Sequence, residues 1–452
     1  MTKKFLLFIG DIAIFYLSLA LTLYIRYGAD YGSQIQNHLF PFSITFVIWI
    51  MTFYILNLYE FVILKNNQDF YNTLLKGIFI GAGLAIAFFY LTPLFEITPK
   101  RNLFIFIAIL TILLVFWRRA FNNLILATTF KNNTIIVGFN QQSLELAKYL
   151  TQHPQFGYQL KYILDTKTNS AYSFEDIDFK QVNGAQDIEK ILKEKNINTV
   201  ILSPEAYQIK EILDVFYKAI SRRIQFFNLS SFYERMTGRV PLSAINQIWF
   251  LENITGVKKI YEFGKRIFDI LFGILLGGLT LVLFMPIAVV IRLSSPGPVL
   301  YNQERVGQGG KIFKIKKFRT MIKNAEENGA VWTQPNDPRI TKFGKFLRKT
   351  RLDELPQVIN ILKGEMSFVG PRAERPEFHE KLKKEMPFYE ERYLIKPGAT
   401  GWAQLQKDYY SSISDTKEKL QYDLFYIKNR SFALDLSIIL KTIYIVLRGG
   451  GR

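Results

Sequence analysis

The chain has 452 residues, long enough for two or three domains, and its formal net charge is +19. It contains no cysteine, which excludes disulfides and thiolate metal sites. Hydrophobic residues make up 49% of the chain and aromatic residues 15%, a composition that favours a membrane protein with soluble parts. Because the basic residues flank apolar runs and no nucleic-acid-binding module is recognisable, we expect a lipid bilayer and phosphorylated substrates as partners, and no nucleic acid.

Four apolar runs within residues 1–125 predict four transmembrane helices. The first follows two lysines and continues for about twenty residues, which is too long for a signal peptide and long enough to span a bilayer. Asp11 lies inside this run, and we expect it to pack against the other helices. Basic residues at the two ends of the bundle place both ends in the cytosol, whereas Lys100 and Arg101 favour the opposite orientation. The remaining runs cover residues 40–58, 75–94 and 103–117.

Residues 126–256 predict a Rossmann-like cytosolic module. The stretch "NTIIVGFNQQSLELAKYL" is typical of a buried strand, a glycine turn and an amphipathic helix, and two similar units follow it. Alternating strands and helices indicate a doubly wound parallel sheet. A pyrophosphate-binding turn requires G-x-G-x-x-G, but here Gly138 stands alone. We therefore favour a structural or regulatory module over a cofactor-binding one, although the pattern leaves both open.

Residues 257–452 begin with an apolar run, 270–291, that is long enough to span a membrane. Basic residues flank both of its ends, so both ends favour the cytosolic side. Pro286 lies within the run and removes a backbone hydrogen bond, which favours a kink. From these residues alone, a spanning helix and a bent helix that enters one leaflet and returns are equally consistent with the pattern.

The stretch "SSPGPVLYNQERVGQGGKIFKIKKFRTM" predicts a β-hairpin with a glycine turn and a basic second strand. Glycines near Lys317 and Arg319 could bind phosphate groups through main-chain donors and side-chain cations. A hairpin with solvated lysines explains the same pattern. The hairpin by itself therefore does not establish a phosphate site.

Asp353 and Glu354 are adjacent acids at the edge of the cationic stretch "TKFGKFLRKTRLDELPQ". One interpretation is structural, because Thr350 and Asp353 fit a capping box. The other is catalytic, because the later turns around Arg372 and Lys396 are also basic and rich in glycine and proline. Several cationic turns around one carboxylate pair suit a diphosphate bound with a divalent ion, in which one carboxylate helps to hold Mg²⁺ and the other attacks phosphorus.

Residues from about 258 to 452 resemble the bacterial sugar transferase family, the monotopic polyprenyl-phosphate glycosyl-1-phosphate transferases. The stretches that carry the resemblance are "KRIFDI", "SSPGPVLYNQERVG", "FKIKKFRTM", "LDELPQVINILKGEMSFVGPR", "KPGATGWAQL" and "YDLFYIKNRSFALDLSIILKT". The segments before residue 258 resemble the large, exopolysaccharide-initiating subfamily more weakly. The expected fold is thus a four-helix transmembrane bundle, a Rossmann-like parallel-sheet domain and a monotopic catalytic domain whose re-entrant helix breaks at Pro286.

The resemblance implies a role for each matching residue. Asp353 would attack the sugar-bearing phosphate of a UDP-hexose and expel UMP, and Glu354 would bind Mg²⁺. Undecaprenyl phosphate would then take the phosphosugar from Asp353 by ping-pong kinetics. Lys317, Arg348 and Arg372 match basic positions near substrate phosphates, and we add Arg319 from the hairpin. Gln404 and Asp423 match further polar positions of the site.

The same resemblance implies a place in the bacterial inner (cytoplasmic) membrane, with the catalytic domain on the cytosolic face, and a possible homodimer.

Many relatives carry Pro-Arg-Pro where this chain has Pro371, Arg372 and Ala373, which makes the loop less rigid. The sugar can be glucose, galactose or an N-acetyl sugar. Two alternative functions are an inert membrane scaffold that holds anionic lipid, and a carboxylate-pair glycosidase. In glycosidases the two carboxyl groups lie about 5 to 9.5 Å apart on opposite sides of the sugar, an arrangement that two adjacent residues rarely reach.

Overall fold

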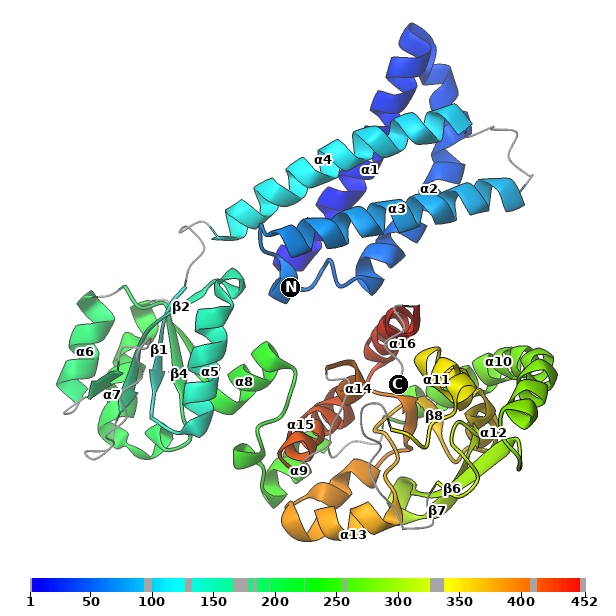
Figure 1. Ribbon diagram of the computed structural model, residues 1–452. Coiled ribbons are helices and arrows are strands. Elements are labelled where there is room, and N and C mark those ends of the chain that lie inside the picture. The colour runs from blue at the N-terminus through cyan, green and yellow to red at the C-terminus, as the bar shows by residue number, and fades with distance from the viewer. Residues whose placement is uncertain are drawn as a thin grey trace. The chain divides into compact units, whose positions relative to one another are not determined.

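The computed structural model describes residues 2–92, 100–126, 132–165, 179–181, 185–194, 196–222, 224–254, 258–325, 337–406 and 413–447. The chain forms two compact units, Met1–Phe232 and Tyr233–Arg452. The first unit contains a helical bundle and an α/β domain, and the second contains one long helix and a mixed α/β part (Figure 1).

The helical bundle consists of the four helices that the apolar runs predict. Three stretches in it, Lys4–Ile55, Gln68–Leu91 and Asn102–Leu124, are long and apolar enough to cross a membrane, and the first contains two of the helices. The bundle helices are α1 (Thr2–Tyr27), α2 (Tyr31–Ile55), α3 (Gln68–Leu91) and α4 (Lys100–Leu126) (Figure 1).

Asp11 lies inside this bundle, as the sequence predicts. Its carboxylate forms an ion pair with Arg118 of α4, and both side chains are fully buried. Nε1 of Trp117 donates to the other carboxylate oxygen at 3.1 Å. The packing role expected for Asp11 is therefore confirmed: it joins α1 to α4.

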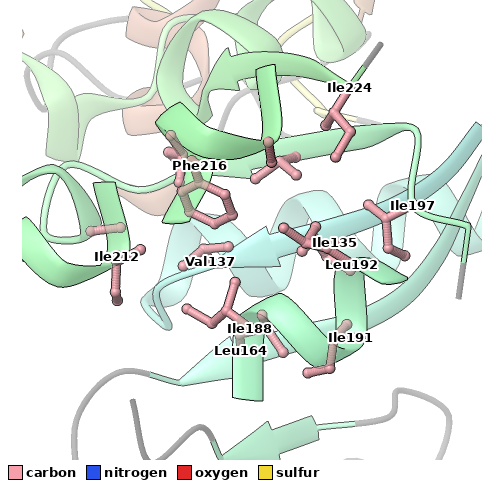
Figure 2. Close-up of a cluster of buried hydrophobic side chains, with 14 residues drawn as sticks. Ile135, Val137, Leu164, Ile188, Ile191, Leu192, Ile197, Ile212, Phe216 and Ile224 are labelled. Atoms are coloured by element: carbon pink, nitrogen blue, oxygen red, sulfur yellow. The ribbon is translucent and has the colours of Figure 1, made fainter. Parts of the chain in front are cut away.

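The α/β domain contains a parallel sheet with the strand order β3-β2-β1-β4-β5, which confirms the predicted alternation of strands and helices. Helices α6 and α7 cover one face of the sheet, and α5 covers the other (Figure 1). Figure 2 shows Ile135 and Val137 of β1 packed with Ile188 of α6 and Phe216 of α7. The elements are β1 (Asn132–Val137), α5 (Gln141–Gln152), β2 (Tyr158–Asp165), β3 (Phe179–Gln181), α6 (Ala185–Glu194), β4 (Thr199–Leu202), α7 (Lys210–Ala219) and β5 (Gln225–Asn228).

The turn between β1 and α5 follows from its single glycine. Gly138 has a φ of +96°, and a Cβ there would collide with the Ser203 side chain. Asn140 caps α5 by accepting a hydrogen bond from the backbone N–H of Ser143 at 2.9 Å. Its amide nitrogen also donates to the Glu205 carboxylate at 3.3 Å. A phosphate at the start of α5 would therefore lie near the negative charge of Glu205, and the backbone N–H of Ser143 is already bound by Asn140.

The second unit is organised around α10 (Lys259–Ser294), a helix of 36 residues that is apolar and long enough to cross a membrane. The backbone stays helical at Pro286, so the predicted re-entrant break remains a prediction. Near the start of α10, Oδ1 of Asp269 accepts hydrogen bonds from the hydroxyl of Ser367 and the backbone N–H of Phe368, both at 3.0 Å. Near its end, Ile291 packs in the same unit in a cluster with side chains of β7 and α11.

Two small sheets and several short helices complete this unit. Strands β6 and β7 pair as the predicted antiparallel hairpin, and β8 pairs with β9 in parallel. Helix α8 (Leu229–Thr237) contains the boundary between the two units. The elements that follow it are α9 (Gln247–Ile254), β6 (Leu300–Val306), β7 (Ile312–Phe318), α11 (Lys342–Lys349), α12 (Val358–Lys363), β8 (Ser367–Val369), α13 (Pro376–Glu385), β9 (Gly398–Thr400), α14 (Trp402–Gln406), α15 (Ile413–Asn429) and α16 (Phe432–Leu447).

Candidate active site

The acid pair lies on a short 3-10 helix, η9 (Leu352–Gln357), between α11 and α12. Arg351 precedes it with a φ of +57°, a left-handed conformation that turns the chain out of α11. The hydroxyl of Thr350 donates back to the carbonyl oxygen of Phe346 at 2.9 Å, and no side chain caps η9. The capping-box interpretation of Thr350 and Asp353 is therefore wrong.

Glu354 is surrounded by cations. Its Oε1 accepts hydrogen bonds from Nζ of Lys317 at 2.8 Å and from Nη2 of Arg372 at 3.3 Å. Nη1 of Arg351 lies 3.8 Å from the other carboxylate oxygen. Burial alone would raise the pKa of Glu354, but these cations outweigh burial and hold the pKa well below its ordinary value. Glu354 is therefore an ionised carboxylate at neutral pH.

The pKa of Asp353 is shifted in the opposite direction from that of Glu354. The side chain of Asp353 is 8% exposed, and its Oδ1 is buried without a hydrogen-bond partner. Burial and the neighbouring charge of Glu354 raise the pKa of Asp353 to about 6, although Lys317 and Arg348 act in the other direction. A buried acceptor without a partner is destabilising unless a ligand uses it. Two adjacent acids with pKa values shifted in opposite directions are typical of an active site.

The cations around the pair come from separate parts of the chain. Lys317 lies on β7, Arg348 on α11, and Arg372 in the loop that follows β8. Nε of Arg348 donates to the hydroxyl of Thr320 at 2.8 Å, which orients the guanidinium. Burial lowers the pKa of Arg348, and the nearby carboxylate of Asp353 offsets part of this effect. The two side chains are therefore close enough to interact electrostatically. The fold thus brings these three predicted residues to the acid pair.

Arg319 has a different environment. Its Nη1 and Nη2 donate to the carbonyl oxygens of Pro296 and Ser295 at 2.6 and 2.7 Å. These bonds fix the turn between α10 and β6, in which Gly297 has a φ of +127°. The guanidinium thus holds backbone in this structure, and the predicted contact of Arg319 with a substrate phosphate remains a prediction.

A second buried charge cluster lies behind the loop that carries Arg372. Nη2 of Arg392 donates to Oδ2 of Asp423 at 2.8 Å and to the carbonyl oxygen of Arg372 at 2.9 Å. Nζ of Lys419 donates to Oε2 of Glu374 at 3.0 Å. Burial raises the pKa of Asp423, whereas the cations around Glu374, led by Lys419, outweigh its burial and hold its pKa at about 2. Asp423 therefore acts through Arg392 on the backbone of Arg372.

Comparison with known proteins identifies the family of this chain. The family model described as bacterial sugar transferase matches residues 260–449, and one described as CoA-binding domain matches residues 54–221. A UDP-glucose:undecaprenyl-phosphate glucose-1-phosphate transferase of Caulobacter vibrioides is 36% identical over 181 residues, which cover 40% of this chain and 68% of the relative. The chain belongs to the bacterial sugar transferase family.

Two further relatives align over longer segments. The UDP-N-acetylgalactosamine-undecaprenyl-phosphate N-acetylgalactosaminephosphotransferase of Aeromonas hydrophila is 42% identical over 231 residues, which cover 50% of this chain and 53% of the relative. A UDP-glucose:undecaprenyl-phosphate glucose-1-phosphate transferase of Xanthomonas campestris is 33% identical over 329 residues, covering 69% of this chain and 66% of the relative. The chain therefore spans between about half and two-thirds of the length of these two sugar transferases.

Gln404 is the remaining predicted residue of the sugar transferase site. It lies on α14, where its Nε2 donates to the carbonyl oxygen of Ala399 at 3.5 Å and its Oε1 is buried without a hydrogen-bond partner. That oxygen lies near Gly401, at the end of the turn that leaves β9. No described contact joins Gln404 to the acid pair, so its role in the site stays a prediction.

The acid pair also bears on the predicted metal ion. Within the described ranges, no group of three or more His, Cys, Asp or Glu side chains gathers at one place. Mg²⁺ is usually held by one or two carboxylates together with substrate phosphates, so a pair is sufficient for it. The ionised carboxylate of Glu354 is a hard oxygen donor of that kind. The residues therefore fit Mg²⁺ in the presence of a diphosphate substrate.

Several residues of this region were not identified as site residues from the sequence. Arg351 was noted only as part of the cationic stretch, yet it is the third cation near Glu354. Its position immediately before the acid pair was the one available signal. Glu374, Arg392 and Lys419 are spread along 46 residues with no shared motif, so only the folded chain reveals that they form one cluster.

Proposed function

We propose that this sugar transferase moves a hexose-1-phosphate from a UDP-sugar to undecaprenyl phosphate, with Asp353 as the covalent nucleophile. The observation that carries the proposal is the unpartnered buried oxygen of Asp353 beside the cation-bound Glu354. A carboxylate with a pKa near 6 is ionised at neutral pH and is destabilised enough by its surroundings to act as a nucleophile. The names of the relatives supply undecaprenyl phosphate as the acceptor class.

The reaction has two steps at one phosphorus atom. In the first step, a carboxylate oxygen of Asp353 attacks the sugar-bearing phosphorus, and the bond to the bridging oxygen breaks with its electron pair leaving on UMP. In the second step, a phosphate oxygen of undecaprenyl phosphate attacks the same phosphorus, and the Asp353 carboxylate leaves. The product is a lipid-diphosphate-sugar that starts assembly of an exopolysaccharide, capsule or O-antigen.

The remaining site residues position and neutralise the diphosphate. Arg372 offers a forked set of donors and Lys317 a point charge, and both already contact the charge of Glu354. Arg348 faces Asp353 and stabilises its ionised form. Glu354 would hold Mg²⁺, which when bound supplies further neutralisation of the phosphate charge.

The contacts of α10 support attachment to one leaflet. Asp269 near its start and Ile291 near its end both pack on elements of the same catalytic part. A straight helix of 36 residues would be about 54 Å long, which exceeds the thickness of the bilayer core. If such a helix spanned the membrane, its two ends would lie on opposite sides of the bilayer. Contacts at both ends with one polar part favour a re-entrant path, and Pro286 is the position at which this helix would bend.

The location and the donor follow from the same proposal. The acid pair would face the cytosol of the bacterial inner membrane, where UDP-sugars are found, and the α/β domain would be a Rossmann-like cytosolic module. The relatives are named for glucose and for N-acetylgalactosamine, so the donor class is a UDP-hexose, including N-acetyl hexoses.

The decisive experiment separates the first step from the second. Purified full-length protein is mixed with Mg²⁺ and a panel of UDP-hexoses in the absence of lipid phosphate, and UMP is quantified. We expect a burst of UMP comparable in amount to the enzyme, with the sugar phosphate attached to the peptide that contains Asp353. Asp353→Asn should give no burst, whereas Asp214→Asn, an exposed aspartate on α7, should match the unaltered protein. A burst retained in Asp353→Asn would overturn the covalent mechanism.

A further inference from the structure

A cavity of about 50 Å³ lies at the start of α10, away from the acid pair. A buried water needs roughly 10 to 15 Å³ of such volume, so the cavity has room for about three to five waters, or for one phosphate-sized group. Its lining contains neither Asp353 nor Glu354, so it is a separate site from the one described above. The lining comes mainly from the first turns of α10, the segment before β9 and the end of α15, with Gln308 and Ser367 completing it.

The charge of the cavity lining favours an anion. Four cations line it, against the carboxylates of Glu262 and Asp269. Each carboxylate already has partners: Glu262 accepts from Nε of Arg430 at 3.0 Å, and Asp269 accepts from Ser367 and from backbone. The cations of the lining are Lys265, Arg266, Lys396 and Arg430.

Three of these cations are held by the protein itself. Lys265 forms an ion pair with Asp435 at 2.6 Å. With Asp435 counted beside Glu262 and Asp269, three carboxylates oppose the four cations, so the cavity has a net charge of +1. Arg266 donates to the carbonyl oxygens of Ile361 and Leu362 at the end of α12, both at 2.7 Å. Arg430 is bound to Glu262 and to the backbone of α15. These contacts fix the frame of the cavity before any ligand binds.

Lys396 is the exception. Within the part of the chain that the structure describes, its ammonium group forms no hydrogen bond and no ion pair, although the side chain is half-buried. Burial and the neighbouring guanidinium of Arg266 lower the pKa of Lys396, and they outweigh the carboxylates of Asp269 and Glu262, which raise it. The two cationic groups approach the same side of Gly364. A half-buried cation placed beside another cation is unfavourable unless an anion joins them.

The surface next to the cavity is apolar. On α10, Ile260 is 87% exposed and Phe263 is 71% exposed, and on the neighbouring α16 Phe432 and Leu436 are also exposed. Phe432 packs against Tyr261 of the cavity lining, with ring centroids 5.2 Å apart. An anion in the cavity would therefore lie between the polar start of α10 and these exposed apolar side chains, which could contact lipid acyl chains.

We infer that this cavity is a second anion site, which binds a single phosphate group between Lys396 and Arg266. The same chemistry fits the phosphate of a membrane lipid headgroup and free inorganic phosphate. The lipid source would anchor the start of α10 at the bilayer surface. Because the site uses none of the acid-pair residues, it stands independently of the transfer reaction.

The test measures binding by the detergent-solubilised full-length protein. Three probes are titrated: short-chain phosphatidylglycerol, inorganic phosphate, and a short-chain diacylglycerol that lacks phosphate. We expect phosphatidylglycerol to bind and diacylglycerol not to bind, and Lys396→Gln to weaken the phosphate-bearing probe about tenfold, the loss of one charge-assisted hydrogen bond. Lys396→Arg should retain binding, and Lys381→Gln, which removes an exposed charge on α13, should leave it unchanged.

The arms also distinguish the source of the phosphate. Equal binding of inorganic phosphate and phosphatidylglycerol, both weakened by Lys396→Gln, would assign a free phosphate; binding of phosphatidylglycerol alone would assign a lipid headgroup. If Lys396→Gln fails to fold, labelling of the unaltered protein with an amine-reactive reagent replaces it, with peptide mass spectrometry as the readout. Protection of Lys396 by either phosphate-bearing probe supports the site. Unchanged binding in Lys396→Gln, or unchanged labelling of Lys396, overturns it.

Discussion

Two buried charge clusters lie in the second unit, and they differ in what their carboxylates do. In the cluster of Glu374 and Asp423, each acid is bound by a cation, and no carboxylate oxygen of either acid is among the buried unpartnered atoms of the described residues. In the acid pair, Glu354 is equally well bound, but Asp353 keeps a buried oxygen without a partner. The first cluster is built for stability, whereas the second retains one unfavourable group.

The difference suggests how the site is organised. Arg392 joins Asp423 to the carbonyl oxygen of Arg372, so the paired cluster supports the loop whose guanidinium reaches Glu354. A rigid support whose carboxylates are paired permits a destabilised group next to it, because the surrounding structure holds that group in place. This view predicts that changes in the two clusters affect stability with opposite signs.

The largest expected effect is from Arg392→Met. The substitution leaves Asp423 buried without its cation, which should destabilise the fold by about 3 to 5 kcal/mol and lower Tm on the order of 10 °C. Thermal unfolding of the purified protein, followed by tryptophan fluorescence, measures this. Arg235→Met, a change at a residue on α8, is the control. An unchanged Tm in Arg392→Met would show that the cluster of Glu374 and Asp423 does not contribute to the stability of the fold.

The second prediction concerns pH. Because attack requires ionised Asp353 and its pKa is about 6, the rate of the UMP burst should fall about tenfold for each pH unit below 6. Lys317 lowers the pKa of Asp353, so Lys317→Met should move the midpoint of the pH profile to a higher pH. Burst rates between pH 5 and pH 8 test both statements. A midpoint near pH 4 in the unaltered protein would contradict the burial argument for Asp353.

Much of this architecture could be predicted from local sequence signals. The four bundle helices follow from apolar runs, and the parallel sheet follows from alternating strands and helices. The acid pair could be located because its basic neighbours lie close to it in the sequence. The assignment of Thr350 as a cap was wrong because propensity does not reveal that Arg351 adopts a left-handed conformation, which separates α11 from η9.

Tertiary contacts explain what local signals missed. Lys396 lies in a basic turn like that of Arg372, and both were expected at the acid pair, yet Lys396 lines the cavity at the start of α10. Arg319 follows Lys317 by two residues, immediately after the end of β7, and its guanidinium binds the backbone of Ser295. Residues that share a motif can therefore face different sites, and the partners that decide this lie far away in the sequence.

The smallest effect, and the one that tests the comparison most directly, is the stability of Asp353→Asn. In the folded protein the raised pKa makes Asp353 hold a proton between about pH 4 and pH 6, which the unfolded chain has released, so ionised Asp353 lowers stability as pH rises through this window. Asparagine avoids that cost, and we expect Asp353→Asn to raise Tm by about 2 to 4 °C at pH 7.5. At pH 4 the gain should disappear, because wild-type Asp353 is then neutral. A lower Tm for Asp353→Asn at pH 7.5 would mean that the Asp353 carboxylate stabilises the fold as that of Glu374 does.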